Sequence, residues 1–239
     1  MPHESVALLA FGAHPDDIEF ACGGVVARET VAGRSARFVV CSRGEAASNG
    51  TPAQRTAEAK KAAKILGATI EFLDLGGDAH FEIRATHTIK LAAILRRSQP
   101  DIVLAPSLLD NQHPDHAKLG HMVRDATRLA RYGGLKELRR WPAHHVNHLL
   151  FYAVTAEAEP AGLGKVLIDV SSKEVLDTWT AAMQAHSSQS RTRNYVELQL
   201  TRARLNGLRA GIGHAIPLFA NDPLLFESLA PLERSARRF

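Results

Sequence analysis

Residues 10–20 read Ala-Phe-Gly-Ala-His-Pro-Asp-Asp-Ile-Glu-Phe. They overlap an apolar run, residues 6–11, that predicts a buried strand, and they lead into a helical pattern. His14, Asp16 and Asp17 are therefore expected on the turn that leaves the end of this strand. In open α/β sheets, ligands bind at this edge of the sheet.

The residue types in this turn favour metal binding. A neutral imidazole and a carboxylate are ordinary zinc ligands. His14 and Asp17 are three residues apart, so one turn can bring both side chains to the same side. Pro15 favours an extended backbone at His14 and is compatible with a helix start. Asp16 is not needed as a ligand in this arrangement, and a second carboxylate beside a metal ligand is suited to act as general base for water at the metal. The alternative is that one of the two aspartates only caps the helix.

A second turn has the same character. Residues 110–116 read Asp-Asn-Gln-His-Pro-Asp-His and follow another apolar run, residues 101–105. Two such turns at one sheet edge can supply three ligands and leave a coordination position open for water. That layout is typical of catalytic rather than structural zinc sites.

Together, the segments 13–17 and 113–116 resemble the paired motifs of the LmbE-like (PIG-L) family of zinc deacetylases. These enzymes remove acetyl groups from N-acetylglucosamine conjugates, and the resemblance extends over about the first three quarters of the chain. Matched to the family motifs, the metal ligands are His14, Asp17 and His116, the base is Asp16, and the electrophile or acid is His113, oriented by Asp115. The resemblance also implies one Zn2+ per chain, with Fe2+ as the alternative metal, and a symmetric homo-oligomer.

The hydrophobic periodicity alternates between strand and helix along the chain. This predicts an α/β fold, a Rossmann-like three-layer sandwich with a mostly parallel sheet. The expected strands are residues 6–11, 36–41, 69–75, 101–105, 147–154 and 166–170, and the expected helices are residues 19–32, 51–66, 87–97, 117–131, 172–185 and 196–209. We expect one domain over residues 1–239, with a core at 1–185 and a C-terminal helix and tail at 186–239. No GxGxxG follows the first strand, which disfavours a dinucleotide site.

The loop at residues 42–50 is long and leaves the same sheet edge, which is typical of a functional loop. A capping box at residues 51–54 then predicts a helix start and places Arg55 in the first turns of that helix. A cation there is disfavoured by the helix dipole unless an anionic or sugar ligand is nearby. Asn49-Gly50-Thr51 followed by Arg55 resembles the bacillithiol-pathway deacetylases, in which this Arg contacts substrate. The implied substrate contacts are Arg55, Arg43, Glu45 and Asn49. The alternative for Arg55 is an exposed surface position.

Several other polar residues are expected to lie outside the metal site. Asp78 and His80 follow the third predicted strand and are expected to be solvated rather than bound to substrate. The adjacent histidines at 144–145 are expected in a loop, because no carboxylate lies nearby in the sequence. His186 begins a His-x-Ser-Gln segment that also resembles the family, which predicts a residue at the pocket rim.

Composition restricts the remaining possibilities. The 239 residues are 45% hydrophobic and 23% charged, with a net charge of +4, as in an ordinary globular protein. The two cysteines, Cys22 and Cys41, form no disulfide framework or CxxC site, which favours a cytoplasmic protein. We expect no signal peptide, membrane span or nucleic-acid partner.

The sequence thus predicts hydrolysis of the acetamide of a small N-acetylated sugar, with the bacillithiol-type GlcNAc-malate conjugate as the closest match in pattern. One alternative is a zinc-binding protein without turnover. The other is a different metal hydrolase, such as another amidohydrolase or a phosphoesterase. Residues 213–219 depart from the bacillithiol-type pattern and leave the acceptor specificity open.

Overall fold

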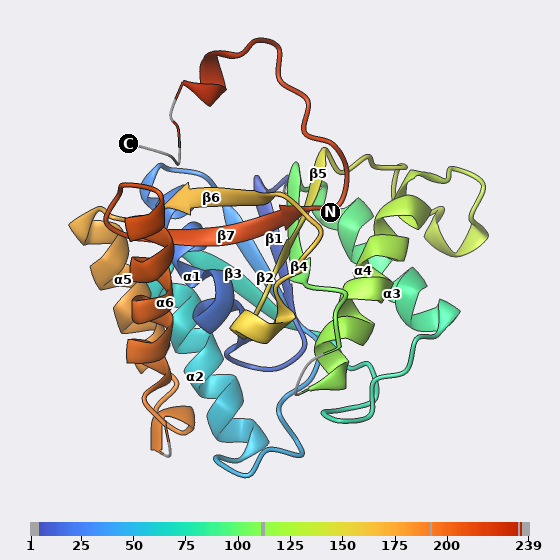
Figure 1. Cartoon of the computed structure of the whole chain (residues 1–239). Coiled ribbons are helices and arrows are strands. Elements are labelled where there is room, and N and C mark those ends of the chain that lie inside the picture. Colours follow the sequence, from blue (N-terminus) through green and yellow to red (C-terminus); the bar gives the residue numbers. More distant parts are fainter. Residues whose placement is uncertain (1–4, 111–112, 192, 234, 236–239) are drawn as a thin grey trace.

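The computed structural model describes residues 5–110, 113–191, 193–233 and 235. Its centre is a seven-stranded sheet in the order β3-β2-β1-β4-β5-β7-β6 (Figure 1). The strands are β1 (Leu8–Gly12), β2 (Ala36–Val40), β3 (Ala68–Phe72), β4 (Ile102–Pro106), β5 (His148–Tyr152), β6 (Lys165–Asp169) and β7 (Ala215–Ala220). The helices are α1 (Asp17–Val31), α2 (Pro52–Ile65), α3 (Ala85–Ser98), α4 (Pro114–Arg131), α5 (Lys173–Gln184) and α6 (Tyr195–Arg209).

The helices form two layers around the sheet. On one face α1, α2, α5 and α6 pack together, and on the other face α3 packs on α4 (Figure 1). Alternate residues of β1 point to opposite faces, so Leu8 and Ala10 join one core while Leu9 and Phe11 join the other. The predicted three-layer α/β sandwich is therefore confirmed.

The chain order of the strands determines where a site can form. From β1 the chain runs outward through β2 to β3, and then returns past β1 to β4. β1 pairs in parallel with both β2 and β4, so the C-terminal ends of β1 and β4 lie side by side where the direction of winding reverses. This is the position at which open α/β sheets bind ligands. Both polar turns leave the sheet here.

β7 was not among the predicted strands. It lies between β5 and β6 and is antiparallel to both. Pro217 argues against an interior strand because it has no N–H to donate. β7 tolerates it because the pairing with β5 involves only Phe219 and Ala220, while Pro217 lies opposite Leu167 of β6. Residues 215–220 are thus part of the sheet rather than of an appended tail.

Among the described residues, no helix combines the length and apolar character needed to span a bilayer.

Candidate metal centre

Three buried side chains meet at the junction of β1 and β4. His14 and Asp17 come from the turn after β1, and His116 comes from the first turn of α4. His14 Nδ1 lies 3.3 Å from His116 Nε2, which lies 3.0 Å from Asp17 Oδ1. His14 Nδ1 is 3.5 Å from Asp17 Oδ2. The structure therefore brings together the three residues expected as metal ligands.

The first turn is closed by the carboxylate of Asp17. Its Oδ2 accepts hydrogen bonds from the backbone N–H groups of Ala13 and His14, both at 2.9 Å, while Oδ1 is directed to His116. Burial alone would raise the pKa of Asp17, but the imidazoles of His116 and His14 outweigh it and hold this pKa well below its usual range. Asp17 is thus an anion fixed in place by its own turn.

The donor set fits a divalent metal. Donor atoms around a tetrahedral metal with bonds of ~2.0–2.1 Å are roughly 3.3 Å apart. His116 Nε2 lies at about this spacing from both His14 Nδ1, at 3.3 Å, and Asp17 Oδ1, at 3.0 Å. Burial opposes positive charge on His14, yet the carboxylates of Asp17, Asp115 and Asp78 raise its pKa well above the usual value. The centre therefore attracts positive charge, which a divalent metal would supply in place of a proton.

The other ring nitrogen of His14 contacts two carboxylates. His14 Nε2 lies 3.1 Å from Asp78 Oδ1 and 3.5 Å from Asp115 Oδ2. Carboxylates in this position fix the tautomer and orientation of a metal-bound imidazole. The expectation that Asp78 is solvated is wrong, because the residue is only 5% exposed. His80, two residues later, is exposed as expected.

Asp78 is buried because of the loop that carries it. Gly76, Gly77 and Ala79 all have positive φ, at 109°, 87° and 67°, which turns this loop tightly toward the sheet. The Ala79 N–H donates to Asp115 Oδ2 at 2.8 Å, and the Asp78 N–H donates to Glu45 Oε2 at 3.0 Å. The only local sequence signal for this loop is its Gly-Gly pair, which does not indicate which way the next side chain points.

His113 lies on the open side of the centre. It is the residue before α4, its side chain is 36% exposed, and its ring centroid lies 4.2 Å from that of His14. His113 Nε2 is 3.3 Å from Asp78 Oδ1, whereas His113 Nδ1 is 4.0 Å from Asp115 Oδ2. Asp78 thus lies closer to His113 than does Asp115, the residue expected to orient it.

A second cluster shares His14 with the first. Donor atoms of His14, Asp78, His113 and Asp115 all lie within 4.8 Å of one another. Metals bound to opposite nitrogens of one imidazole would be roughly 6 Å apart, given bonds of ~2 Å on each side of the ring. Two-metal phosphoryl-transfer sites hold their ions about 3.5–4 Å apart. The two clusters therefore do not have the spacing of a two-metal phosphoesterase centre.

Asp16 occupies the position before α1 with a strained backbone. Its φ is 118°, which side chains other than glycine rarely adopt, and its carboxylate makes no capping hydrogen bond. Helix capping therefore does not explain Asp16. Burial raises the pKa of Asp16 to about 6, although the nearby Arg55 guanidinium lowers it. A carboxylate with this pKa beside a metal is suited to accept a proton near neutral pH.

Arg55 holds this carboxylate. Its Nη2 donates to Asp16 Oδ2 at 3.2 Å and to the carbonyl oxygen of Pro15 at 2.8 Å. The residue is 4% exposed, so an exposed surface position is excluded. Gly44 and Gly50 enclose it so tightly that a Cβ added at Gly44 would lie 2.1 Å from Arg55 Nη1.

The other three predicted substrate contacts lie along the loop at residues 42–50. Arg43 places its guanidinium 5.0 Å from the centre of the Phe72 ring. Glu45 joins two loops by accepting the N–H groups of Arg43 and Asp78, each at 3.0 Å. The Asn49 carbonyl oxygen accepts a hydrogen bond from Gln189 Nε2 at 3.0 Å.

Two further expectations can be compared with the structure. His186 is 1% exposed and lies with Nε2 3.2 Å from Glu19 Oε1, so the expectation of a rim position is wrong. The histidines at 144–145 lie in a loop as expected, and His144 Nε2 donates to the Pro100 carbonyl oxygen at 2.9 Å.

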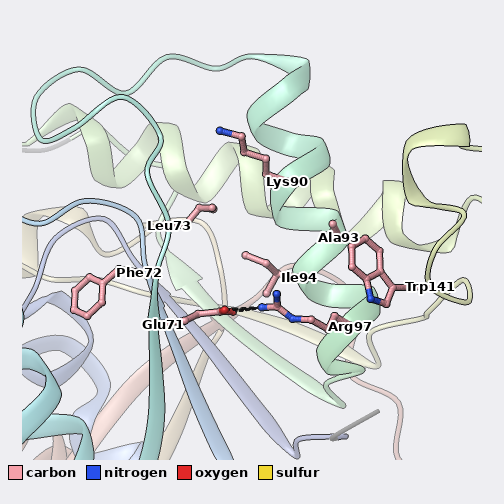
Figure 2. Close-up of a pocket in the computed structure, with 8 residues that line it drawn as sticks. All are labelled: Glu71, Phe72, Leu73, Lys90, Ala93, Ile94, Arg97 and Trp141. Carbon is pink, nitrogen blue, oxygen red and sulfur yellow. Dashed lines mark hydrogen bonds and ion pairs between the residues drawn. The ribbon is translucent and has the colours of Figure 1, made fainter. Parts of the chain in front are cut away.

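Two hollows of the structure lie away from the metal centre. Figure 2 shows a pocket of about 230 Å³ between β3 and α3, with Trp141 at one end and the Glu71–Arg97 ion pair across it. A second hollow of about 560 Å³ lies between α5 and α6. Neither includes a side chain of the metal centre.

Comparison with known proteins assigns the chain to a family. A sequence model of the PIG-L family, described as GlcNAc-PI de-N-acetylase, matches residues 9–127, which include both polar turns. The chain belongs to the PIG-L family. The crystal structure of the conserved protein TT1542 from Thermus thermophilus superposes with a TM-score of 0.82 at 31% identity, covering 96% of this chain and 100% of that one.

Characterised relatives of this PIG-L protein include two kinds of enzyme. The chain is 34% identical to 4-oxalmesaconate hydratase of Pseudomonas putida over 54% of each protein. It is 26% identical to diacetylchitobiose deacetylase of Thermococcus kodakarensis, over 76% of this chain and 69% of the relative. The match thus spans only about half of the hydratase and more of the deacetylase.

Proposed function

We propose that this protein is a metal-dependent hydrolase that removes the acetyl group from an N-acetylglucosamine conjugate. The observation that carries the proposal is the Arg55–Asp16 pair beside the three metal ligands, because a site that only stores metal needs no base. The deacetylase relative and the family description support the same chemistry. Our proposed metal is Zn2+, with Fe2+ as the alternative.

In this mechanism His14, Asp17 and His116 would hold the metal. A bound divalent metal supplies Lewis acidity for the acetamide carbonyl and the attacking water. Asp16 takes a proton from that water as its oxygen attacks the carbonyl carbon. His113 donates a hydrogen bond to the oxygen that gains negative charge, and one such donor is worth about 3–4 kcal/mol. The C–N bond then breaks, and the amine leaves with a proton from Asp16 or His113 while acetate remains.

The finer assignment is a small N-acetylated sugar, either GlcNAc-malate of the bacillithiol type or a related conjugate. Arg55 was the reason to expect a carboxylate on the substrate, and in the structure its guanidinium is bound to Asp16 and Pro15. The proposed substrate contacts are Arg55, Arg43, Glu45 and Asn49, and Arg55 in addition holds the proposed base. We also propose a cytoplasmic homo-oligomer without nucleic-acid or membrane partners.

One experiment tests the activity. Release of acetate and free amine should be measured on GlcNAc-malate, GlcNAc-inositol, free N-acetylglucosamine and N,N′-diacetylchitobiose, with and without a chelator. We expect chelator-sensitive release from at least one of these. No release from any of them by protein that carries one metal per chain would contradict the proposal.

The second candidate is hydration of an unsaturated acid, which the 34% identity to 4-oxalmesaconate hydratase favours. The same metal and base could activate water for addition to a C=C bond rather than to an amide. Incubation with 4-oxalmesaconate, followed by loss of its conjugated ultraviolet absorbance without acetate release, would identify this activity.

A further inference from the structure

Residues 186–189, which we call the clasp, connect three elements around the metal centre. His186 Nε2 lies 3.2 Å from Glu19 Oε1 in the first turn of α1. Ser187 and Ser188 bind α2, and Gln189 donates to the Asn49 carbonyl oxygen in the loop before α2. None of these contacts involves His14, Asp17 or His116. The clasp is therefore separate from the metal ligands, but it touches the elements that carry Asp16 and Arg55.

Glu58 of α2 anchors the clasp. Its Oε1 accepts hydrogen bonds from Ser187 Oγ at 2.9 Å and from the Ser188 N–H at 3.0 Å. Its Oε2 accepts one from Ser188 Oγ at 2.6 Å. The residue is 8% exposed, and although burial opposes its charge, the hydrogen bonds from Ser188 and Ser187 keep the pKa of Glu58 below its usual value. Hydrogen bonds to an ionised group are stronger than neutral ones, so this contact is firm.

A continuous line of contacts leads from Glu58 to the base. Ser188 lies against Gly50, where an added Cβ would be 2.8 Å from Ser188 Cβ and 3.3 Å from Arg55 Cγ. Arg55 is therefore held between the loop and the turn after β1, and its Nη2 reaches Asp16 Oδ2 at 3.2 Å. If the clasp releases Ser188, the loop loses its support and Arg55 gains room to move.

We propose that Glu58 is a positioning residue for the Arg55–Asp16 pair, acting through Ser188 and Gly50. The proposal rests on the assignment of Asp16 as the base. Small displacements of a reacting group reduce rates by large factors because the reacting atoms must be aligned. Glu58 should therefore set the turnover rate without contacting substrate or metal.

The test compares Glu58→Ala with Glu58→Gln and with Glu29→Ala. Glu29 lies near the far end of α1 from Asp16, where it pairs with Arg34, and is the control for loss of a helix carboxylate. We expect Glu58→Ala to reduce kcat about tenfold per metal-loaded chain, with KM nearly unchanged. Glu58→Gln should retain most of the rate, because its amide oxygen can still accept from Ser187 and the Ser188 N–H while its NH2 donates to Ser188 Oγ. Equal kcat in wild-type and Glu58→Ala protein would overturn the proposal.

Hydrogen exchange gives a readout that does not depend on the reaction. Glu58→Ala should speed exchange of the amides at residues 44–51 while those of α3 and α4 stay protected. Unchanged exchange at 44–51, or an equal increase across the chain, would contradict a local positioning role. If the wild-type protein releases no acetate, the proposed function fails, and exchange alone decides whether the clasp holds the loop. Ser188→Ala removes the two hydrogen bonds of Ser188 Oγ, to Glu58 and from Gln189, but keeps the backbone N–H bond to Glu58. It should give a smaller change of the same pattern, which serves as the test if Glu58→Ala does not fold.

Discussion

The guanidinium of Arg55 donates to Asp16 Oδ2 at 3.2 Å and, through the same nitrogen, to the carbonyl oxygen of Pro15 at 2.8 Å. One cation thus holds both the carboxylate and the backbone of the turn that carries it. The contact helps to maintain the positive φ of Asp16, because strained residues persist only where their surroundings determine them. Arg55 thereby links the loop at 42–50 to the metal centre.

Replacement of Asp16 tests its proposed role as the base separately from metal binding. Asp16→Asn keeps the size of the side chain and tolerates positive φ, but it cannot accept a proton. We expect one metal per chain as in the wild type and a loss of turnover of about 10²–10⁴-fold. His14→Ala is the comparison, and it should lose both metal and activity. Normal turnover by metal-loaded Asp16→Asn would remove Asp16 from the mechanism.

The pH dependence of the rate should reflect the ionisation of Asp16 beside Arg55. The proposed base, Asp16, can accept a proton only when it is ionised. The rate should therefore decrease as the pH is lowered through the pKa of Asp16, about 6. Burial raises this pKa and Arg55 lowers it, so Arg55→Met should move the acidic limb of kcat/KM to higher pH. The loss of rate should then be larger at pH 6 than at pH 8. An acidic limb that does not move in Arg55→Met would show that the pair does not control the ionisation measured.

Asp78 should contribute to the metal affinity of the site formed by His14, Asp17 and His116 without being one of its ligands. Its Oδ1 lies 3.1 Å from His14 Nε2, so Asp78→Asn weakens the support of a ligand ring. We expect metal affinity to fall about 10–100-fold, measured by competition with a chromophoric chelator. Asp125→Asn, at a surface carboxylate of α4, is the matched control and should bind metal normally. Wild-type affinity in Asp78→Asn would mean that this contact does not support His14.

Two adjacent arginines of α3 offer a test of buried against exposed charge. Arg96 is 1% exposed and donates to the carbonyl oxygens of Ala130, Leu138, Trp141 and Tyr132. Arg96→Met removes these four hydrogen bonds from a buried cation and should reduce the free energy of unfolding by about 3–5 kcal/mol. Arg97 forms an exposed ion pair with Glu71, so Arg97→Met should cost about 1 kcal/mol or less. Denaturant midpoints of the two variants measure the difference, and equal midpoints would contradict the assigned role of Arg96.

The convergence of the three expected metal ligands could be predicted because they lie in two short segments of the sequence. His14, Asp17 and His116 each follow a strand, and parallel strands bring such turns to one edge of the sheet. Asp78 could not be placed in this way. Its burial depends on the positive φ of Ala79 and on a hydrogen bond to Glu45, which is 33 residues away in the sequence.

The two other misjudged elements have related causes. His186 was expected at the rim, but its position is set by Glu19, and contacts between such distant residues leave no periodic pattern. β7 was missed because Pro217 argues against an interior strand, and only the short pairing of β5 with Phe219 and Ala220 makes it acceptable. Local sequence therefore indicated most helices and strands, whereas long-range contacts determined which polar residues are buried.

The position of β7 also bears on how the chain is made. In the described part of the chain β6 pairs only with β7 (Ala215–Ala220), so β6 has no partner until these later residues have left the ribosome. During synthesis the five parallel strands, β1 to β5, can assemble first. Until β7 is made, β6 and the free edge of β5 have unpaired backbone groups. A nascent chain that stalls or is cut before residue 215 would thus expose a sheet edge of the kind that chaperones and proteases recognise.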